Sequence, residues 1–158
     1  MSDNGKRDFL NHKFPELLKT LSSDTKANFG LMTPQHMVEH LVGALGSAVT
    51  KYEGERENPP SKGQLGMQKF IQSGSVLVHR PSAKTKADLP PLKFASLEEA
   101  ISKVPEAVQN YYAFKDDNPA YKPYAAFMGE VSHEDVELFH YMHIKYHLWQ
   151  FSLLEQYP

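Results

Sequence analysis

The chain has 158 residues, 41% hydrophobic and 23% charged, which is the composition of one soluble globular domain. Its net charge of -2 excludes the strong basic field of nucleic-acid and anionic-membrane proteins, so we expect no nucleic acid and no membrane among its partners. The absence of cysteine excludes disulfides, thiolate nucleophiles and thiolate metal ligands, leaving His, Asp and Glu to bind any metal.

No apolar run approaches the length of a membrane span, and no hydrophobic stretch follows the basic residues near the start of the chain. A cytoplasmic location is therefore predicted. We expect a single domain over residues 1–158, with residues 1–7 polar and flexible.

The first predicted helix covers residues 8–21, where apolar side chains recur every three or four positions. Pro15 is expected to bend this helix or delay its start, because proline has no N–H to donate. A second helix is predicted to begin at Thr33 and Pro34, with threonine as N-cap and proline at the first helical position, and to continue to about Tyr52.

Less regular segments follow in the middle of the chain. We predict a loop over 54–66, a short helix over 65–73, an extended piece over 75–79 and a long irregular connection over 80–94. Long connections of this kind often cover binding sites.

Two more helices complete the pattern. Ser96 is the expected N-cap of a helix that runs to about Phe114 with a bend at Pro105, and residues 115–129 form a predicted loop. Ser132 is the expected N-cap of the last helix, which extends to about Leu154. Four substantial helices joined by long connections predict an all-α, antiparallel four-helix bundle.

Histidines cluster on two of these helices. His140, His143 and His147 share one face of the last helix, and His36 and His40 lie one turn apart on the second. Imidazole is the commonest protein ligand for transition metals, so two such helices can hold one ion between them. The spacing leaves a shared metal site and a set of packed, hydrogen-bonded histidines about equally open.

His36 to His40 also spells H-x-x-E-H, the inverted zinc-protease motif, in which the glutamate activates water. Such short motifs match by chance. We therefore favour Glu39 as a solvated helix residue over a protease site.

Two longer motifs carry a family resemblance. Residues 138–151 read LFHYMHIKYHLWQF after the entry segment FMGEVS at 127–132, and residues 32–41 read MTPQHMVEHL. Together these segments resemble a branch of the DinB-like proteins whose last helix carries H-x-x-x-H-x-x-Q-F.

The resemblance implies an up-down-down-up four-helix bundle in which three histidines hold a divalent metal. On this sequence the implied ligands are His40, His143 and His147. His36 and His140 each lie one turn before a ligand and are the candidate catalytic residues, as a fourth ligand, a partner of a ligand or a general base. Zinc or nickel is the favoured metal, with iron and manganese as further candidates.

The resemblance also implies a small-molecule substrate and a homodimer. Family members join low-molecular-weight thiols to electrophiles, and this chain, which has no cysteine, would need such a thiol as a cosubstrate. Metal-activated water is the alternative nucleophile, giving a hydrolase. A non-catalytic metal or small-ligand binding protein, and a purely structural role for the histidines, are the competing readings.

An aromatic cluster precedes the last helix. It consists of Tyr111, Tyr112, Phe114, Tyr121, Tyr124 and Phe127. These side chains can line a substrate pocket, form a dimer interface or pack the loop onto the helices, and packing is the favoured interpretation.

Overall fold

The computed structural model describes residues 3–75 and 85–155, and it is mainly helical. The first helical segment consists of α1 (Asp3–Asp8), the π-helical turn η1 (Phe9–Lys13) and α2 (Phe14–Leu18). It therefore begins before the predicted start at residue 8, within the part expected to be flexible. The π turn arises where the Phe14 N–H donates to the Phe9 carbonyl, just before Pro15, which has no N–H with which to continue the α-helical pattern.

Helix α3 (Pro34–Ser47) begins where predicted, because the Thr33 side chain accepts a hydrogen bond from the His36 N–H. It ends before the predicted Tyr52. Helix α4 (Lys62–Gln72) begins earlier than predicted, because Ser61 and Gln64 form a reciprocal capping box. Most of the predicted extended piece over 75–79 lies outside the described residues, and the long connection contains a short 3₁₀ turn, η2 (Lys86–Asp88).

The helix predicted from Ser96 to Phe114 is two helices, α5 (Leu97–Ser102) and α6 (Val104–Asp117). The break falls at Lys103, because Pro105 removes a backbone donor from the first turn of α6. The expected bend is thus a full interruption.

The all-α prediction missed a small antiparallel hairpin, β1 (Tyr124–Ala125) and β2 (Gly129–Glu130). Side chains from α4 hold it in place: Gln64 Nε2 donates to the Ala126 carbonyl at 3.1 Å and Gln68 Nε2 to the Met128 carbonyl at 2.7 Å. The hairpin leads directly into α7 (His133–Gln150), whose start is fixed by the capping box of Ser132 and Asp135.

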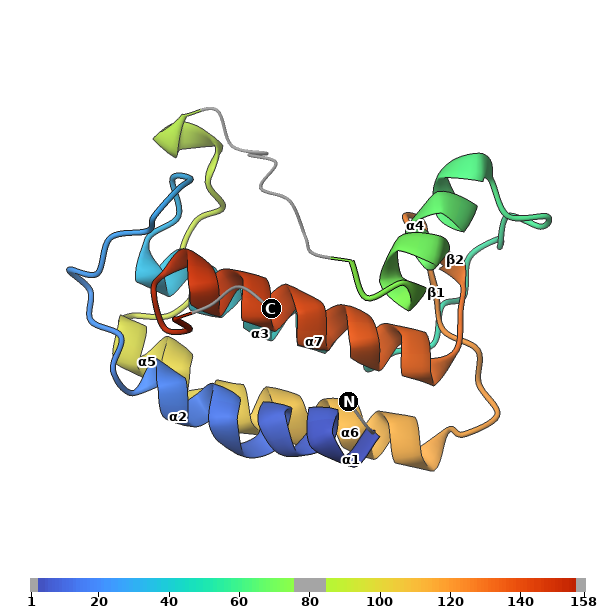
Figure 1. Ribbon diagram of the computed structural model, residues 1–158, viewed down its shortest axis with the longest axis horizontal. Helices are drawn as coiled ribbons and strands as arrows, with labels where there is room; N and C mark the ends of the chain where they lie inside the picture. Colours follow the sequence, from blue (N-terminus) through green and yellow to red (C-terminus); the bar gives the residue numbers. More distant parts are fainter. Residues whose placement is uncertain (1–2, 76–84, 156–158) are drawn as a thin grey trace.

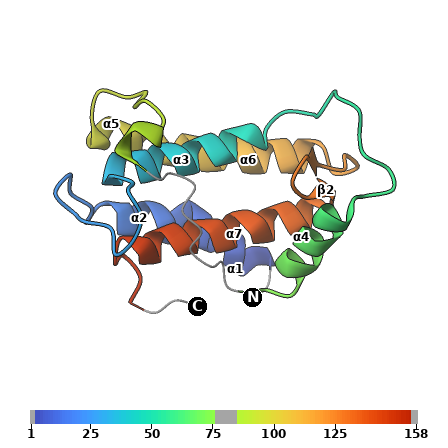
Figure 2. The same ribbon diagram turned by 90° about the horizontal axis from the view of Figure 1, so that it is seen from above.

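Figures 1 and 2 show four long helical segments lying alongside one another: α1–α2, α3, α6 and α7. The first and last run in one direction, and α3 and α6 run in the other (Figure 1). Their inward faces form one hydrophobic core, which includes Leu10, Phe14, Leu18, Met37, Leu41, Leu45, Val104, Val108, Ile144 and Leu148. Within residues 3–75 and 85–155, no helix is both long and apolar enough to cross a membrane.

Candidate metal centre

Three of the predicted histidines converge between α3 and α7. His40 Nε2 lies 2.9 Å from His143 Nε2, and His147 Nε2 lies 3.1 Å from the same atom. The ligand nitrogens of the three residues all lie within 4.8 Å of one another. A metal bound at the usual length of about 2.1 Å would separate tetrahedral nitrogens by about 3.4 Å, so the two close contacts of His143 would have to lengthen and a separation near the 4.8 Å limit would have to shorten.

Gln150 orients His147. Its Nε2 donates to the Phe29 carbonyl at 3.0 Å, so its Oε1 faces His147 Nδ1 at 2.7 Å. An amide oxygen only accepts, so the proton of neutral His147 resides on Nδ1. The Nε2 lone pair of His147 is therefore directed at the other two histidines, as in metal sites where a neighbour fixes the tautomer of a ligand.

The two short nitrogen contacts of His143 are difficult to satisfy without a cation. Its Nε2 faces the lone pair of His147 and also lies 2.9 Å from His40 Nε2. One N–H on His143 would have to serve both neighbours, and without it two lone pairs would meet. A metal ion accepts all three lone pairs together.

The environment keeps these imidazoles neutral. Burial lowers the pKa of His147 to about 4, and burial and the neighbouring histidines lower the pKa of His143 well below its usual value. His40, the most exposed of the three, also has a pKa below its usual value, because partial burial disfavours its charged form. The ligand lone pairs are therefore available at neutral pH.

His140 does not join the three nitrogens. It is 3% exposed, its ring packs 5.0 Å from that of Tyr111 on α6, and burial lowers its pKa to about 4. Its Nδ1 and the Tyr111 hydroxyl are buried without a hydrogen-bond partner among the described residues, as is His143 Nδ1.

His36 lies away from the other histidines and has other partners. Its Nδ1 is 2.7 Å from the Thr33 hydroxyl, and its Nε2 is 3.1 Å from the Pro90 carbonyl. Both ring nitrogens thus have partners, Nδ1 at the start of α3 and Nε2 in the long connection that packs against it. This arrangement gives no support to a role as fourth ligand or general base.

Glu39 has a structural role that sequence reasoning missed. Its carboxylate accepts hydrogen bonds from the backbone N–H groups of Lys93 and Phe94 at 2.8 and 3.0 Å, and from Gln35 at 3.0 Å. It is therefore not simply a solvated residue, and these bonds direct it toward the loop rather than toward a metal-bound water.

A pocket of about 450 Å³ adjoins His40 and His143. Its walls come from α3, α6, the hairpin and α7, and include Tyr111, Tyr121, Tyr124, Phe127, Met128, Phe139 and His140. Four of the six aromatic residues singled out in the sequence thus line a pocket, although packing was the favoured interpretation. Tyr112 packs in the core, where its hydroxyl donates to Glu137 Oε1 at 2.7 Å.

A comparison with protein-family models, with curated proteins and with solved structures finds no match to the chain. The candidate centre is therefore assessed from its own geometry: three convergent imidazoles, one oriented by Gln150, beside a largely apolar pocket.

Proposed function

We propose that the chain is a metal-dependent enzyme of the DinB-like type, with His40, His143 and His147 holding a divalent transition metal. Zinc and nickel are the favoured ions, because imidazole suits both; iron and manganese are the further candidates. The observation that carries the proposal is the meeting of three Nε2 atoms, with His147 held in its ligand tautomer by Gln150.

The arrangement of the helices is compatible with this proposal. Segments α1–α2 and α7 run opposite to α3 and α6, which is the order expected of an up-down-down-up bundle (Figure 1). Such a bundle allows α3 to contribute one ligand and α7 two, as metal sites in helical bundles commonly do.

Three protein ligands leave coordination positions for a reactant. When bound, the ion supplies Lewis acidity that lowers the pKa of a ligated thiol or water, so that a nucleophile forms at neutral pH. The chain has no cysteine, so a thiol would enter as a cosubstrate. The pocket beside His40 and His143 gives an electrophile room next to that nucleophile.

His140 fits a role in contacting substrate better than a role as general base. A general base works best with a pKa near the working pH, whereas burial lowers the pKa of His140 to about 4. Its buried Nδ1 lacks a partner among the described residues, and its side chain lines the pocket where a bound molecule would lie.

A non-catalytic metal or small-ligand binding protein is the second candidate. One observation favours it: among the described residues, no Asp or Glu lines the pocket. In addition, burial lowers the pKa of His40, His140 and His143 in its wall below the usual value. A binding protein needs the convergent nitrogens and the pocket, but no group poised to move a proton.

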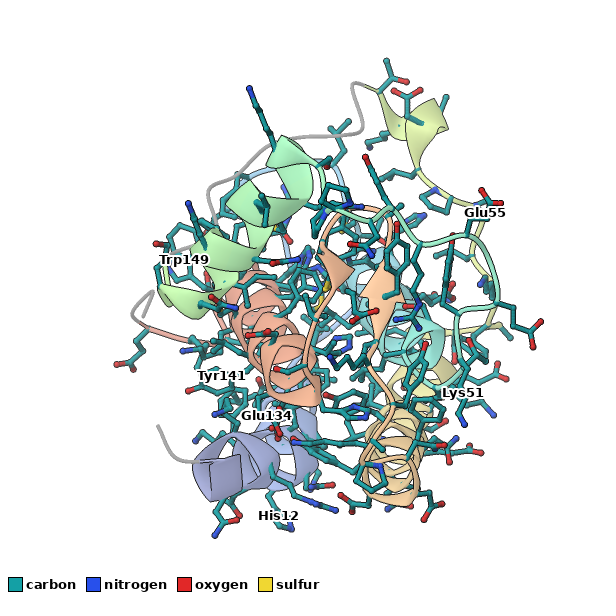
Figure 3. The ribbon with its side chains drawn as sticks, turned by 90° about the vertical axis from the view of Figure 1, so that its right-hand side faces the viewer. His12, Lys51, Glu55, Glu134, Tyr141 and Trp149 are labelled. Atoms are coloured by element: carbon teal, nitrogen blue, oxygen red, sulfur yellow. The ribbon has the colours of Figure 1, made fainter. Side chains whose placement is uncertain are left out.

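Metal content tests the site directly. Protein purified without a histidine tag should contain about one transition metal per chain by mass spectrometry, and His143→Ala/His147→Ala should contain none. His12→Ala is the matched control, because His12 lies at the outer edge of the first helical segment (Figure 3), where its side chain is bonded to Asp8. Wild-type protein that stays metal-free after reconstitution with zinc, nickel, iron and manganese would exclude the proposal.

Gln150→Leu sharpens this test. Partners that orient a metal ligand typically contribute roughly 10- to 100-fold to metal affinity, so the variant should bind the metal more weakly by about that factor.

The metal-loaded protein is then assayed with glutathione plus 1-chloro-2,4-dinitrobenzene, and with p-nitrophenyl acetate alone. Turnover of glutathione with 1-chloro-2,4-dinitrobenzene favours the transferase, and turnover of p-nitrophenyl acetate favours the hydrolase. Metal binding with neither activity favours the binding protein. The expected homodimer stays a prediction, to be measured by light scattering.

A further inference from the structure

Three buried polar atoms gather in the residues that form the pocket wall: the Tyr111 hydroxyl, His140 Nδ1 and His143 Nδ1. They are the only buried side-chain polar atoms without a hydrogen-bond partner in residues 3–75 and 85–155. All three residues line the same pocket. Most buried polar atoms are paired, so a cluster of exceptions at one cavity requires a specific explanation.

Two other polar side chains that line this pocket do have partners. The Ser47 hydroxyl donates to the Ala44 carbonyl at 2.7 Å, and His133 Nε2 lies 2.8 Å from the Asn118 carbonyl. The unpartnered atoms therefore belong to one part of the wall, beside the candidate metal ligands. This localisation points to a bound molecule rather than to loose packing of the whole pocket.

The pocket is built for an uncharged molecule. Among the described lining residues there is no Lys, Arg, Asp or Glu. Two cations lie behind the wall: Arg56, 5.5 Å from the ring centres of Tyr121 and Tyr124 and paired with Glu130 at 2.8 Å, and Lys51, 5.9 Å from the ring centre of Tyr121. In the absence of a bound metal ion, a charged ligand would lose its hydration without gaining a partner of opposite charge from the lining residues.

The unpartnered atoms are all able to present protons to a ligand. Burial raises the pKa of Tyr111 far above its usual value, so its hydroxyl keeps its proton. When His143 Nε2 binds a metal, the remaining proton of the neutral ring resides on Nδ1. His140 Nδ1 donates in one of its two tautomers. The ligand that satisfies this group of atoms is one with an acceptor oxygen.

We propose that the pocket binds a neutral, mainly apolar small molecule with a carbonyl oxygen that accepts hydrogen bonds from Tyr111 and His140. This proposal rests on the proposed metal-dependent function in one respect, because that function is what would place the bound molecule beside a nucleophile. Its hydrogen bonds come from the pocket wall alone. Apolar walls with a few convergent polar groups are the usual design of small-molecule sites.

Acetophenone and α-methylstyrene form a matched pair of probes, because they have nearly the same shape and differ in replacing C=O by C=CH₂. Each is titrated into ¹⁵N-labelled protein, with and without bound zinc, and amide shifts give Kd. Acetophenone should bind about tenfold more tightly than α-methylstyrene, as expected for two modest hydrogen bonds. In the protein without zinc, benzoate, which carries a charge, should bind more weakly than acetophenone.

Tyr111→Phe and Tyr112→Phe separate the pocket from the fold, because the two residues are neighbours on α6 and each variant loses one hydroxyl. Tyr111→Phe should remove most of the preference for acetophenone and leave α-methylstyrene binding unchanged. Tyr112→Phe should leave both affinities unchanged, because its hydroxyl bonds to Glu137. Equal affinities for the two probes in wild type would overturn the proposal and mean that water satisfies these atoms.

No binding by either probe up to its solubility limit would overturn the proposal as well. The metal measurement is independent of these titrations. If the protein binds no metal but still prefers acetophenone, and this preference depends on Tyr111, the result supports the carbonyl pocket and excludes the metal-dependent function. Protein that binds one metal per chain but shows no preference excludes only the carbonyl pocket.

Discussion

Glu137 and His140 lie about one turn apart on α7, with exposed fractions of 1% and 3%, but the surroundings of their polar atoms differ. Glu137 Oε1 accepts from the Tyr112 hydroxyl and Oε2 from Lys115 Nζ, both at 2.7 Å. His140 Nδ1 has no partner among the described residues. The contrast repeats on α6, where Tyr112 is paired and its neighbour Tyr111 is not.

The paired region holds helices together. Lys115 and Tyr112 join α6 to α7 through Glu137, the Arg7 guanidinium lies 4.4 Å from the Tyr112 ring centre, and Arg7 also bonds to Asp116 at 2.7 Å. These contacts tie the first helical segment to the same group. We infer that satisfied buried polar groups on α7 maintain the fold, whereas unsatisfied ones one turn later await a ligand.

Breaking the paired region should have the largest effect on stability. Lys115→Ala leaves the Glu137 carboxylate buried with only Tyr112 as partner, so we expect a loss of about 4 kcal/mol in the free energy of unfolding, measured with urea. The double variant Glu137→Leu/Lys115→Met removes both charges and should recover most of that loss. A loss in Lys115→Ala below about 1 kcal/mol would mean that this ion pair behaves as a surface pair.

Acid should destabilise the unpaired region. The pKa of His140 is about 4 in the folded chain and 6.5 in its unperturbed state, so both states are neutral above pH 6.5 and the unfolded state takes up the proton first as the pH falls. Stability should therefore decrease between pH 6.5 and about 4, with His140 contributing about 3 kcal/mol.

The measurement compares wild type with His140→Leu after chelation of metal, by urea unfolding at several pH values. The wild type should lose more stability on acidification, because the variant lacks this imidazole but keeps His147 and His143. Identical pH profiles would show that burial does not lower the pKa of His140, because a group that accepts a hydrogen bond from the protonated ring then stabilises it.

Local signals in the sequence predicted the presence of the long helices and two of the three convergent histidines. Capping residues such as Thr33, Ser96 and Ser132 fixed helix starts, because N-caps act on the next turn of the chain. The spacing of the histidines on α7 placed His143 and His147 on one face, and the resemblance supplied His40. These features depend on short separations along the chain or on a recognisable motif.

The missed features depend on contacts between distant segments. The hairpin is held by Gln64 and Gln68 from α4, and Glu39 is engaged by backbone groups of the loop at Lys93 and Phe94. Gln150 lies one turn after His147 in the sequence, but its orientation depends on the Phe29 carbonyl. No local pattern in the sequence reports such partners.

Adjacent tyrosines give the finest test of the comparison, because Tyr111 and Tyr112 are the same residue type with opposite surroundings. Tyr112→Phe leaves Glu137 Oε1 without its donor and should cost about 1 to 3 kcal/mol in the free energy of unfolding. Tyr111→Phe removes a hydroxyl that has no protein partner, so stability should stay within about 0.5 kcal/mol of wild type or rise slightly. Urea unfolding of both variants without added ligand makes the measurement. Equal losses in the two variants would contradict the division of α7 into a region that maintains the fold and a region that awaits a ligand, because the Tyr111 hydroxyl would then be paired in the ligand-free protein.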